Sequence, residues 1–127
     1  MYVLDASVLV AVMKAEPGSE KLLRFFNGSL MSAVNHSEVL QKFAQLGGSV
    51  ENAATLISGF DIHVVPFDLK LSAETASLWP LTRHNGLSLG DRSCLALAEA
   101  MTGIAVTADT AWAKLDLPGI AIHVIDR

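Results

Sequence analysis

The sequence predicts an α/β fold in which helices cover both faces of a parallel sheet. Short strand-like segments alternate with helical segments along the chain, which is typical of this class. One strand, Ile104-Ala105-Val106-Thr107, is almost continuously apolar, as expected for a strand that is covered on both faces. The 127 residues are enough for one compact core, so we expect a single domain over residues 1–127.

The first half of the chain is predicted from its turn and cap residues. A buried strand ends at Asp5, and Pro17 is favoured in the first turn of a helix that ends at Asn27-Gly28. Gly47-Gly48 ends a later helix, and Ser49 caps the next one. The expected elements are a strand at 2–4, a helix at 7–15, a helix from 17 to 26, a brief strand near 30–31, and helices at 35–46 and 49–58.

The second half follows the same alternation. Asp68 caps a long helical stretch that Pro80 should kink or split before Asn85-Gly86 ends it. A helix that opens at Gly90-Asp91 should bury a stripe running to Met101. The remaining expected elements are strands at 62–65, 104–107 and 121–125, and a helix that starts near Asp109.

Composition narrows the possible functions. The net charge of −4 argues against broad electrostatic capture of nucleic acid but leaves a local basic patch or a metal-bridged phosphate contact possible. With 51% apolar residues, we expect a partner or second subunit to cover some surface. The single cysteine, Cys94, fits a buried position in a reducing cytoplasm. No stretch approaches the ~20 apolar residues of a membrane span, so no membrane role is expected.

Acidic residues stand at the ends of several predicted elements. Asp5 follows the first strand, Glu38 lies early in the helix after the second, Asp91 opens a helix, and Asp109 follows the apolar strand. Parallel strands bind ligands at their carboxyl ends, and pairing of the first strand with strand 104–107 would bring Asp5 and Asp109 to one edge. Such carboxylates would repel each other without a cation. Oxygen ligands without a Cys/His set favour Mg²⁺ or Mn²⁺, which act on phosphates.

Each acid also has a structural interpretation. Asp5, Asp91 and Asp109 stand where a helix cap would accept backbone N–H groups. Glu38 precedes Lys42 by four residues, which is the favourable spacing for an ion pair on a helix.

Four segments together resemble the PIN-domain ribonucleases, and specifically the VapC-type toxins of toxin–antitoxin modules. They are VLDASVLVAV, MSAVNHSEVL, LSLGDRSCLALA and VTADTAW, and the resemblance extends over essentially the whole chain. It implies a three-layer α/β/α PIN-like fold with a parallel sheet of strand order 3-2-1-4-5.

The resemblance also implies a function. A Mg²⁺- or Mn²⁺-dependent endoribonuclease is expected, in which water activated by the metal cleaves an RNA phosphodiester. Its implied partners are a second copy in a homodimer and a cognate VapB-like antitoxin that obstructs the site. The family's metal-binding and catalytic acids fall on Asp5, Glu38, Asp91 and Asp109, with Ser7 and Thr107 as hydroxyl support for them.

Two other classes of function share part of this pattern. A phosphatase or phosphoacceptor domain also places Asp at a strand end. However, the haloacid-dehalogenase pattern needs a second Asp where Ser7 stands. A receiver domain needs a Lys at the end of its last strand, where this chain has Ile125-Asp126. A catalytically silent PIN-like module that binds RNA or protein would tolerate loss of an acid, and here all are present.

One segment is unusually apolar for a single helix. Because one helix face can hardly bury four such side chains, part of the segment is predicted to contact the antitoxin. These side chains are Leu22, Leu23, Phe25 and Phe26.

Overall fold

A five-stranded sheet of order β3-β2-β1-β4-β5 forms the centre of the computed structural model, which describes residues 1–125. All neighbouring strands are parallel, so the predicted α/β fold and strand order are confirmed. Asp126, which stands near the position where a receiver domain needs a Lys, lies outside the described residues. The strands are β1 (Tyr2–Leu4), β2 (Ser29–Ser32), β3 (Ile62–Val65), β4 (Ile104–Thr107) and β5 (Ala121–Val124).

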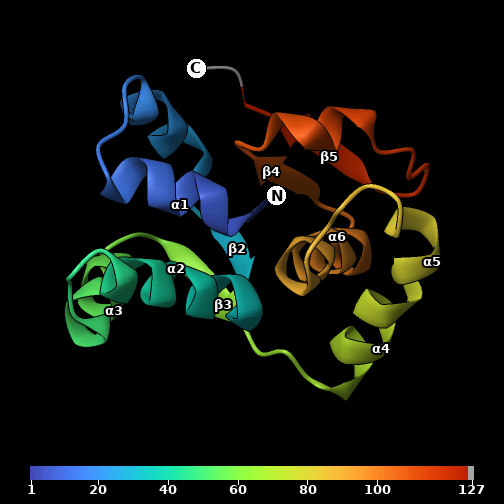
Figure 1. Ribbon diagram of the computed structural model, residues 1–127, viewed down its shortest axis with the longest axis horizontal. Coiled ribbons are helices and arrows are strands. Elements are labelled where there is room, and N and C mark those ends of the chain that lie inside the picture. Colours follow the sequence, from blue (N-terminus) through green and yellow to red (C-terminus); the bar gives the residue numbers. More distant parts are fainter. Residues whose placement is uncertain (126–127) are drawn as a thin grey trace.

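Helices cover both faces of this sheet and complete a three-layer α/β/α arrangement (Figure 1). One group packs on the face formed by Leu4, Met31 and Val106, and the other on the face formed by Val3, Leu30 and Ala105. The first group is α1 (Ala6–Met13), the 3₁₀ helix η1 (Ser19–Phe25), α2 (Ala33–Gln45) and α3 (Val50–Ser58). The second is α4 (Leu69–Ser77), α5 (Trp79–Thr82), α6 (Leu89–Met101) and the 3₁₀ helix η2 (Thr110–Lys114).

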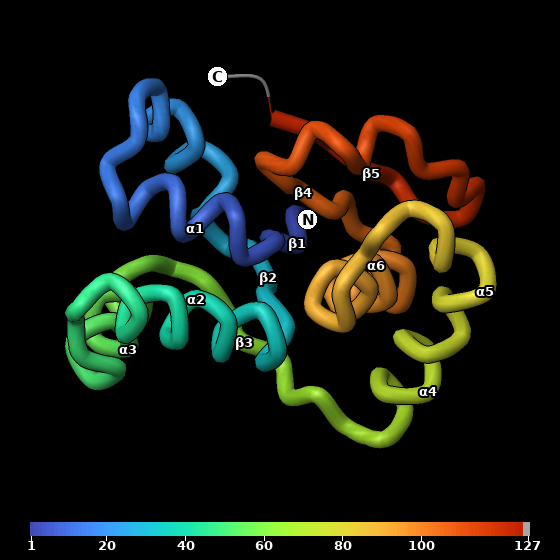
Figure 2. The backbone as a smooth tube through the Cα atoms, in the orientation of Figure 1, coloured from blue at the N-terminus to red at the C-terminus, as the bar shows by residue number. Residues whose placement is uncertain are grey.

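The chain changes face after β3. Figure 2 shows it leaving the side of α2 and α3 and crossing to that of α4 and α6. In the centre of the sheet, β1 pairs with β4 in the register Val3↔Ala105 and Leu4↔Val106. The carboxyl ends of β1, β2 and β4 therefore meet at one edge.

Cap and breaker residues behave largely as predicted. The Asp68 carboxylate accepts the Leu71 N–H at 2.9 Å at the start of α4, and the Ser49 hydroxyl accepts the Asn52 N–H at 3.0 Å at the start of α3. Pro80 lies in the first turn of α5, where the predicted long helix divides into two. No helix within residues 1–125 is long and apolar enough to cross a membrane.

The segment after Pro17 differs from the prediction. It forms a 3₁₀ helix that begins only at Ser19, and three of its four large apolar side chains are buried. A 3₁₀ helix has three residues per turn, so Leu22 and Phe25 lie on the same face. Phe26 follows the helix and packs edge-on against Phe60, with ring centroids 5.0 Å apart.

As expected, the segment does not bury all four of these side chains, but only Leu23 is left exposed. Phe25 and Phe26 are each only 4% exposed, whereas Leu23 is 44% exposed. Both rings belong to the core of this chain, which removes the reason for assigning them to an antitoxin contact. The stripe predicted on α6 is also shorter than expected, because Met101 at its end is 44% exposed.

Candidate metal centre at the carboxyl edge of the sheet

Asp5 is the most deeply buried of the predicted acids, with 4% of its surface exposed. It follows β1 directly, and its backbone N–H donates to the Val106 carbonyl at 2.9 Å. The residue occupies the N-cap position of α1, but its side chain makes no capping hydrogen bond. Its Oδ2 instead accepts hydrogen bonds from Ser7 Oγ at 2.8 Å and Thr107 Oγ1 at 3.0 Å. The helix-cap interpretation therefore does not account for this carboxylate.

Ser7 and Thr107 connect α1 to the end of β4. The backbone N–H of Ala108 donates to Ser7 Oγ, and that of Asp109 donates to Thr107 Oγ1, each at 3.0 Å. Each hydroxyl thus accepts from the loop after β4 while it donates to Asp5. This arrangement fixes the orientation of the Asp5 carboxylate.

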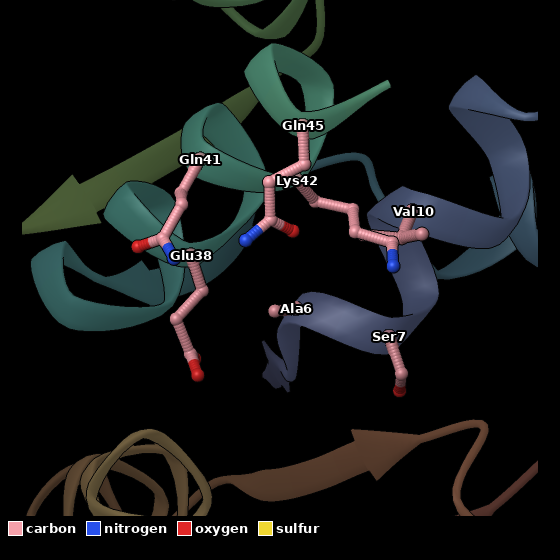
Figure 3. A pocket seen from close by; sticks show the side chains of 7 residues that line it. All are labelled: Ala6, Ser7, Val10, Glu38, Gln41, Lys42 and Gln45. Carbon is pink, nitrogen blue, oxygen red and sulfur yellow. The ribbon is translucent and has the colours of Figure 1, made fainter.

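Glu38 projects from α2 toward the same edge. Figure 3 shows its side chain pointing to the side of α6 and β4, as that of Ser7 does. Glu38 is half-buried, and its Oε1 accepts a hydrogen bond from Asn35 Nδ2 at 2.9 Å. Within residues 1–125 it forms no ion pair with Lys42, so the surface salt-bridge interpretation is not supported.

Asn35 lies at the centre of a buried polar network beneath Glu38. Its side chain is fully buried, and Nδ2 also donates to the Gly90 carbonyl at 3.0 Å. Its Oδ1 accepts from Ser32 Oγ at 2.8 Å and from Ser93 Oγ at 3.4 Å. The network joins β2, α2 and α6, because Ser32 ends β2 and Ser93 lies within α6.

Gly90 allows α6 to approach Glu38 closely. A Cβ atom at this position would overlap the Glu38 carboxylate. The close contact therefore requires a residue without a side chain.

Asp91 stands at the start of α6 and serves as a cap. Its Oδ2 accepts the Ser88 N–H at 2.9 Å, while Ser88 Oγ accepts the Asp91 N–H at 3.1 Å, which together form a capping box. The capping interpretation is confirmed for this residue. Asp91 is nevertheless half-buried and electrostatically coupled to Asp5 and Glu38.

Asp109 is less closely associated with the other acids. Its side chain is exposed and caps η2 by accepting the Ala111 N–H at 3.0 Å. Its link to the site runs through its backbone N–H and Thr107. The structure thus brings Asp5, Glu38 and Asp91 together as an acidic site, with Asp109 beside it.

The charges of the acidic site act on one another. Burial, opposed by hydrogen bonds from Ser7 and Thr107 and reinforced by the charges of Asp91 and Glu38, raises the pKa of Asp5 from 3.8 to about 6. Burial also raises the pKa of Glu38, with a further contribution from Asp91. The buried thiol of Cys94 has its pKa raised well above the ordinary value, mainly by burial and further by all three acids.

This electrostatic pattern fits a divalent cation. Within residues 1–125 no group of three or more His, Cys, Asp or Glu side chains is already arranged to hold a metal ion. The donors are nevertheless carboxylate oxygens, which suit Mg²⁺ and Mn²⁺, and their mutual repulsion is what a cation would neutralise. The residues present therefore fit such an ion chemically.

Two residues that shape the acidic site, Asn35 and Gly90, were not predicted from the sequence to do so. Asn35 was assigned only as the start of a helix, although it lies three residues before Glu38, a spacing at which helix side chains meet. Gly90 was predicted only to open a helix. Its position directly before the candidate ligand Asp91 was the one indication in the sequence that it lies at the site.

The sequence matches the PIN domain family over residues 2–117. The chain therefore belongs to this family, as its motifs indicated. No curated protein matches the chain.

Solved structures with the same fold include proteins of toxin–antitoxin systems. The chain is similar to a toxin–antitoxin complex from Klebsiella pneumoniae, with a TM-score of 0.74, 15% identity and coverage of 98% of this chain and 100% of that chain. VapBC2 from Rickettsia felis bound to a promoter DNA fragment has a TM-score of 0.74 and 16% identity, with coverage of 98% of this chain and 98% of that chain. VapC20 from Mycobacterium tuberculosis, a sarcin-ricin loop cleaving toxin, has a TM-score of 0.76 and 14% identity, with coverage of 91% of this chain and 97% of that chain. At these identities the likeness shows the fold.

Proposed function

We propose that the protein is a metal-dependent endoribonuclease that acts as the VapC-type toxin of a toxin–antitoxin pair. The observation that carries the proposal is the convergence of Asp5, Glu38 and Asp91 from three separate elements at the carboxyl edge of the sheet. Burial raises the pKa values of Asp5 and Glu38 there, and the charge of Asp91 adds to both shifts. Membership of the PIN family and the likeness to toxin structures support the same conclusion.

In this proposal Asp5, Glu38, Asp91 and Asp109 hold Mg²⁺ or Mn²⁺. The chemistry expected from such a cation is activation of a water molecule and neutralisation of charge at the phosphodiester. Ser7 and Thr107 keep the Asp5 carboxylate in a fixed orientation through their hydrogen bonds. Asn35 does the same for Glu38.

The proposal includes partners in the cytoplasm, namely a VapB-like antitoxin and a second copy of the chain. Large apolar side chains remain exposed on α3, α4, α5 and α6, and such surfaces are commonly covered by protein partners. They include Val50, Leu56, Leu69, Trp79, Leu81 and Leu89, which are 49% to 90% exposed.

Incubation of the purified protein with RNA and Mn²⁺ tests the activity. Wild-type protein should cut RNA, and excess chelator or Asp5→Asn should abolish cutting. Glu51→Gln is a matched control, because it neutralises an exposed acid on α3 and should leave cleavage unchanged. Cleavage that persists in chelator would contradict the metal-dependent mechanism. If no RNA is cut, the chain is better described as a catalytically silent PIN-like binding module.

A further inference from the structure

A groove between α1 and α2 begins at the acidic site. Ser7, which donates to Asp5, and Glu38 line its inner end, so the groove shares Glu38 with the acidic site. It encloses about 330 Å³, which lies at the lower end of the range for small-ligand pockets. Figure 3 shows the groove open between the two helices.

One cation stands in this groove. Lys42 reaches from α2 toward Val10 on α1, and both residues line the groove (Figure 3). Within residues 1–125 the Lys42 ammonium has no hydrogen bond or ion pair to another side chain. The backbone of Lys42 lies about one helical turn beyond that of Glu38, roughly 6 Å along the helix axis.

Beyond Ser7, Glu38 and Lys42, the polar side chains of the groove are neutral amides. Gln41 and Gln45 line it from α2, and Figure 3 shows the Gln45 side chain hanging into the open space. A carboxamide offers both donors and an acceptor, which suits base edges and the 2′-hydroxyl of RNA. Val10 adds an apolar surface on the opposite side, against which a sugar or base can pack.

We propose that this groove binds the nucleotide next to the scissile phosphodiester of a single-stranded RNA. Lys42 pairs with the phosphate of that nucleotide, and Gln41 and Gln45 contact its polar edges. The inference rests on the proposed function, because it takes the acidic site as the place of cleavage. It adds the direction in which the RNA strand leaves that site.

Charge favours RNA over a peptide as the occupant. The chain carries a net charge of −4, so a phosphate near the acidic site needs a local cation to hold it. Lys42, four residues after Glu38 on α2, supplies one. A peptide with basic side chains would pair with the acids and leave Lys42 without a partner.

RNA binding measured by fluorescence anisotropy tests the inference. The protein carries Asp5→Asn so that the oligonucleotide stays intact, and the titration is repeated at several KCl concentrations. Adding Lys42→Gln should weaken binding by about two- to fivefold, the effect of one exposed ion pair. The slope of log affinity against log salt should become less steep by about 0.7, as expected for one lost phosphate contact on a single strand.

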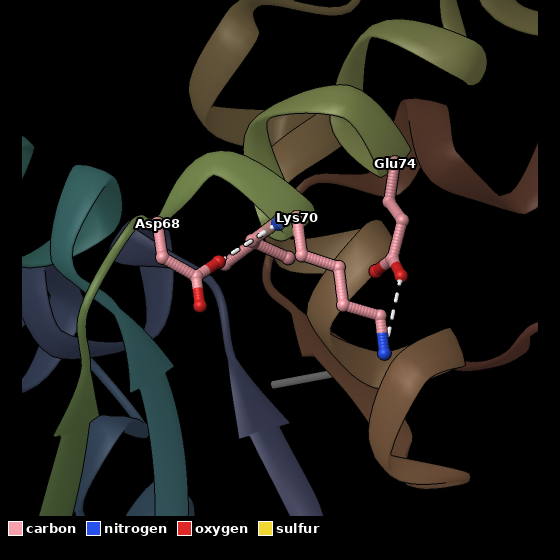
Figure 4. A network of polar contacts seen from close by, with 4 residues as sticks. Asp68, Lys70 and Glu74 are labelled. Atoms are coloured by element: carbon pink, nitrogen blue, oxygen red, sulfur yellow. Dashed lines mark hydrogen bonds and ion pairs between the residues drawn. The ribbon is translucent and has the colours of Figure 1, made fainter.

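Two further variants sharpen this test. Gln45→Lys adds a cation to the groove and should tighten binding and steepen the salt slope. Lys70→Gln removes the same charge from α4, where Lys70 pairs with Glu74 at 3.9 Å (Figure 4), and should leave both quantities unchanged. In cleaving protein, Lys42→Gln should raise KM and leave kcat nearly unchanged.

The outcomes separate this inference from the proposed function. If Lys42→Gln binds RNA with unchanged affinity and salt slope, or behaves as Lys70→Gln does, the inference is overturned and the groove is left to a protein partner. If wild-type protein binds RNA through Lys42 but cuts none, the proposed function fails while the groove assignment stands.

Discussion

The Asn35 carboxamide holds the Glu38 carboxylate against α6. Asn35 Nδ2 donates to Glu38 Oε1 at 2.9 Å and to the Gly90 carbonyl at 3.0 Å, so one buried side chain ties a proposed metal ligand to the neighbouring helix. Groups that orient a metal ligand in this way commonly influence metal affinity strongly.

Replacement of Asn35 by alanine should therefore affect both stability and metal binding. Asn35→Ala removes a partner of buried polar groups, which should lower the free energy of unfolding by about 1–3 kcal/mol. It should also weaken Mn²⁺ binding about tenfold or more, because Glu38 loses its orientation. Urea denaturation and calorimetric Mn²⁺ titration measure the two effects. Asn52→Ala on the exposed face of α3 is the control, and equal Mn²⁺ affinity in both variants would refute the role.

Gly90→Ala should displace Glu38. The added Cβ would overlap the Glu38 carboxylate, which Asn35 holds in place, so Mn²⁺ affinity and RNA cleavage should both fall sharply. Gly119→Ala is a matched control, since its Cβ would lie 3.2 Å from Oε2 of the exposed Glu99, whose side chain can move away. Wild-type Mn²⁺ affinity in Gly90→Ala would show that the contact is unimportant for the site.

The pKa of Asp5 predicts a pH dependence of stability in chelator. The folded state raises this pKa from 3.8 to about 6, so folding favours the protonated acid. The contribution of Asp5 is most favourable below pH 4 and is lost as the pH rises through about 6, at a cost of about 3 kcal/mol. Asp5→Asn should thus be more stable than the wild type at pH 7, with little difference near pH 4. Urea denaturation across this range tests it, and a difference that does not vary with pH would contradict the prediction.

The buried position of Phe25 predicts a large loss of stability on truncation. Phe25→Ala should lower the free energy of unfolding by about 3–5 kcal/mol, because it leaves a cavity between η1 and the sheet. Leu23→Ala, two residues away and 44% exposed, should cost much less. Similar losses in chemical denaturation of the two variants would show that the Phe25 ring is not part of the core.

The strand pattern could be predicted because it depends on local sequence. Short apolar segments separated by helices indicate a parallel sheet, and the resemblance to the PIN family supplied the strand order. The 3₁₀ helix of residues 19–25 could not be predicted in the same way. Its Phe25 ring packs against Tyr2 of β1 and His123 of β5, and such contacts between distant parts of the chain are not encoded in the residue pattern of the segment itself.

The acidic residues of the site were easier to predict than Asn35 and Gly90, which position Glu38. Asp5 and Glu38 follow parallel strands, whose carboxyl ends must share an edge, so their proximity follows from topology. The roles of Asn35 and Gly90 depend on how closely α2 and α6 approach. These residues lie 55 positions apart in the sequence, and no local pattern encodes that distance.

The proposed cleavage depends on metal binding at the acidic site. Anomalous diffraction from crystals soaked in Mn²⁺ detects such binding. We expect an anomalous peak in contact with the carboxylates of Asp5 and Asp91, within reach of Glu38, and its loss in Asp5→Asn crystals. Well-diffracting soaked crystals with no peak there, or with a peak that persists in Asp5→Asn, would show that Asp5 and its neighbours do not hold the metal.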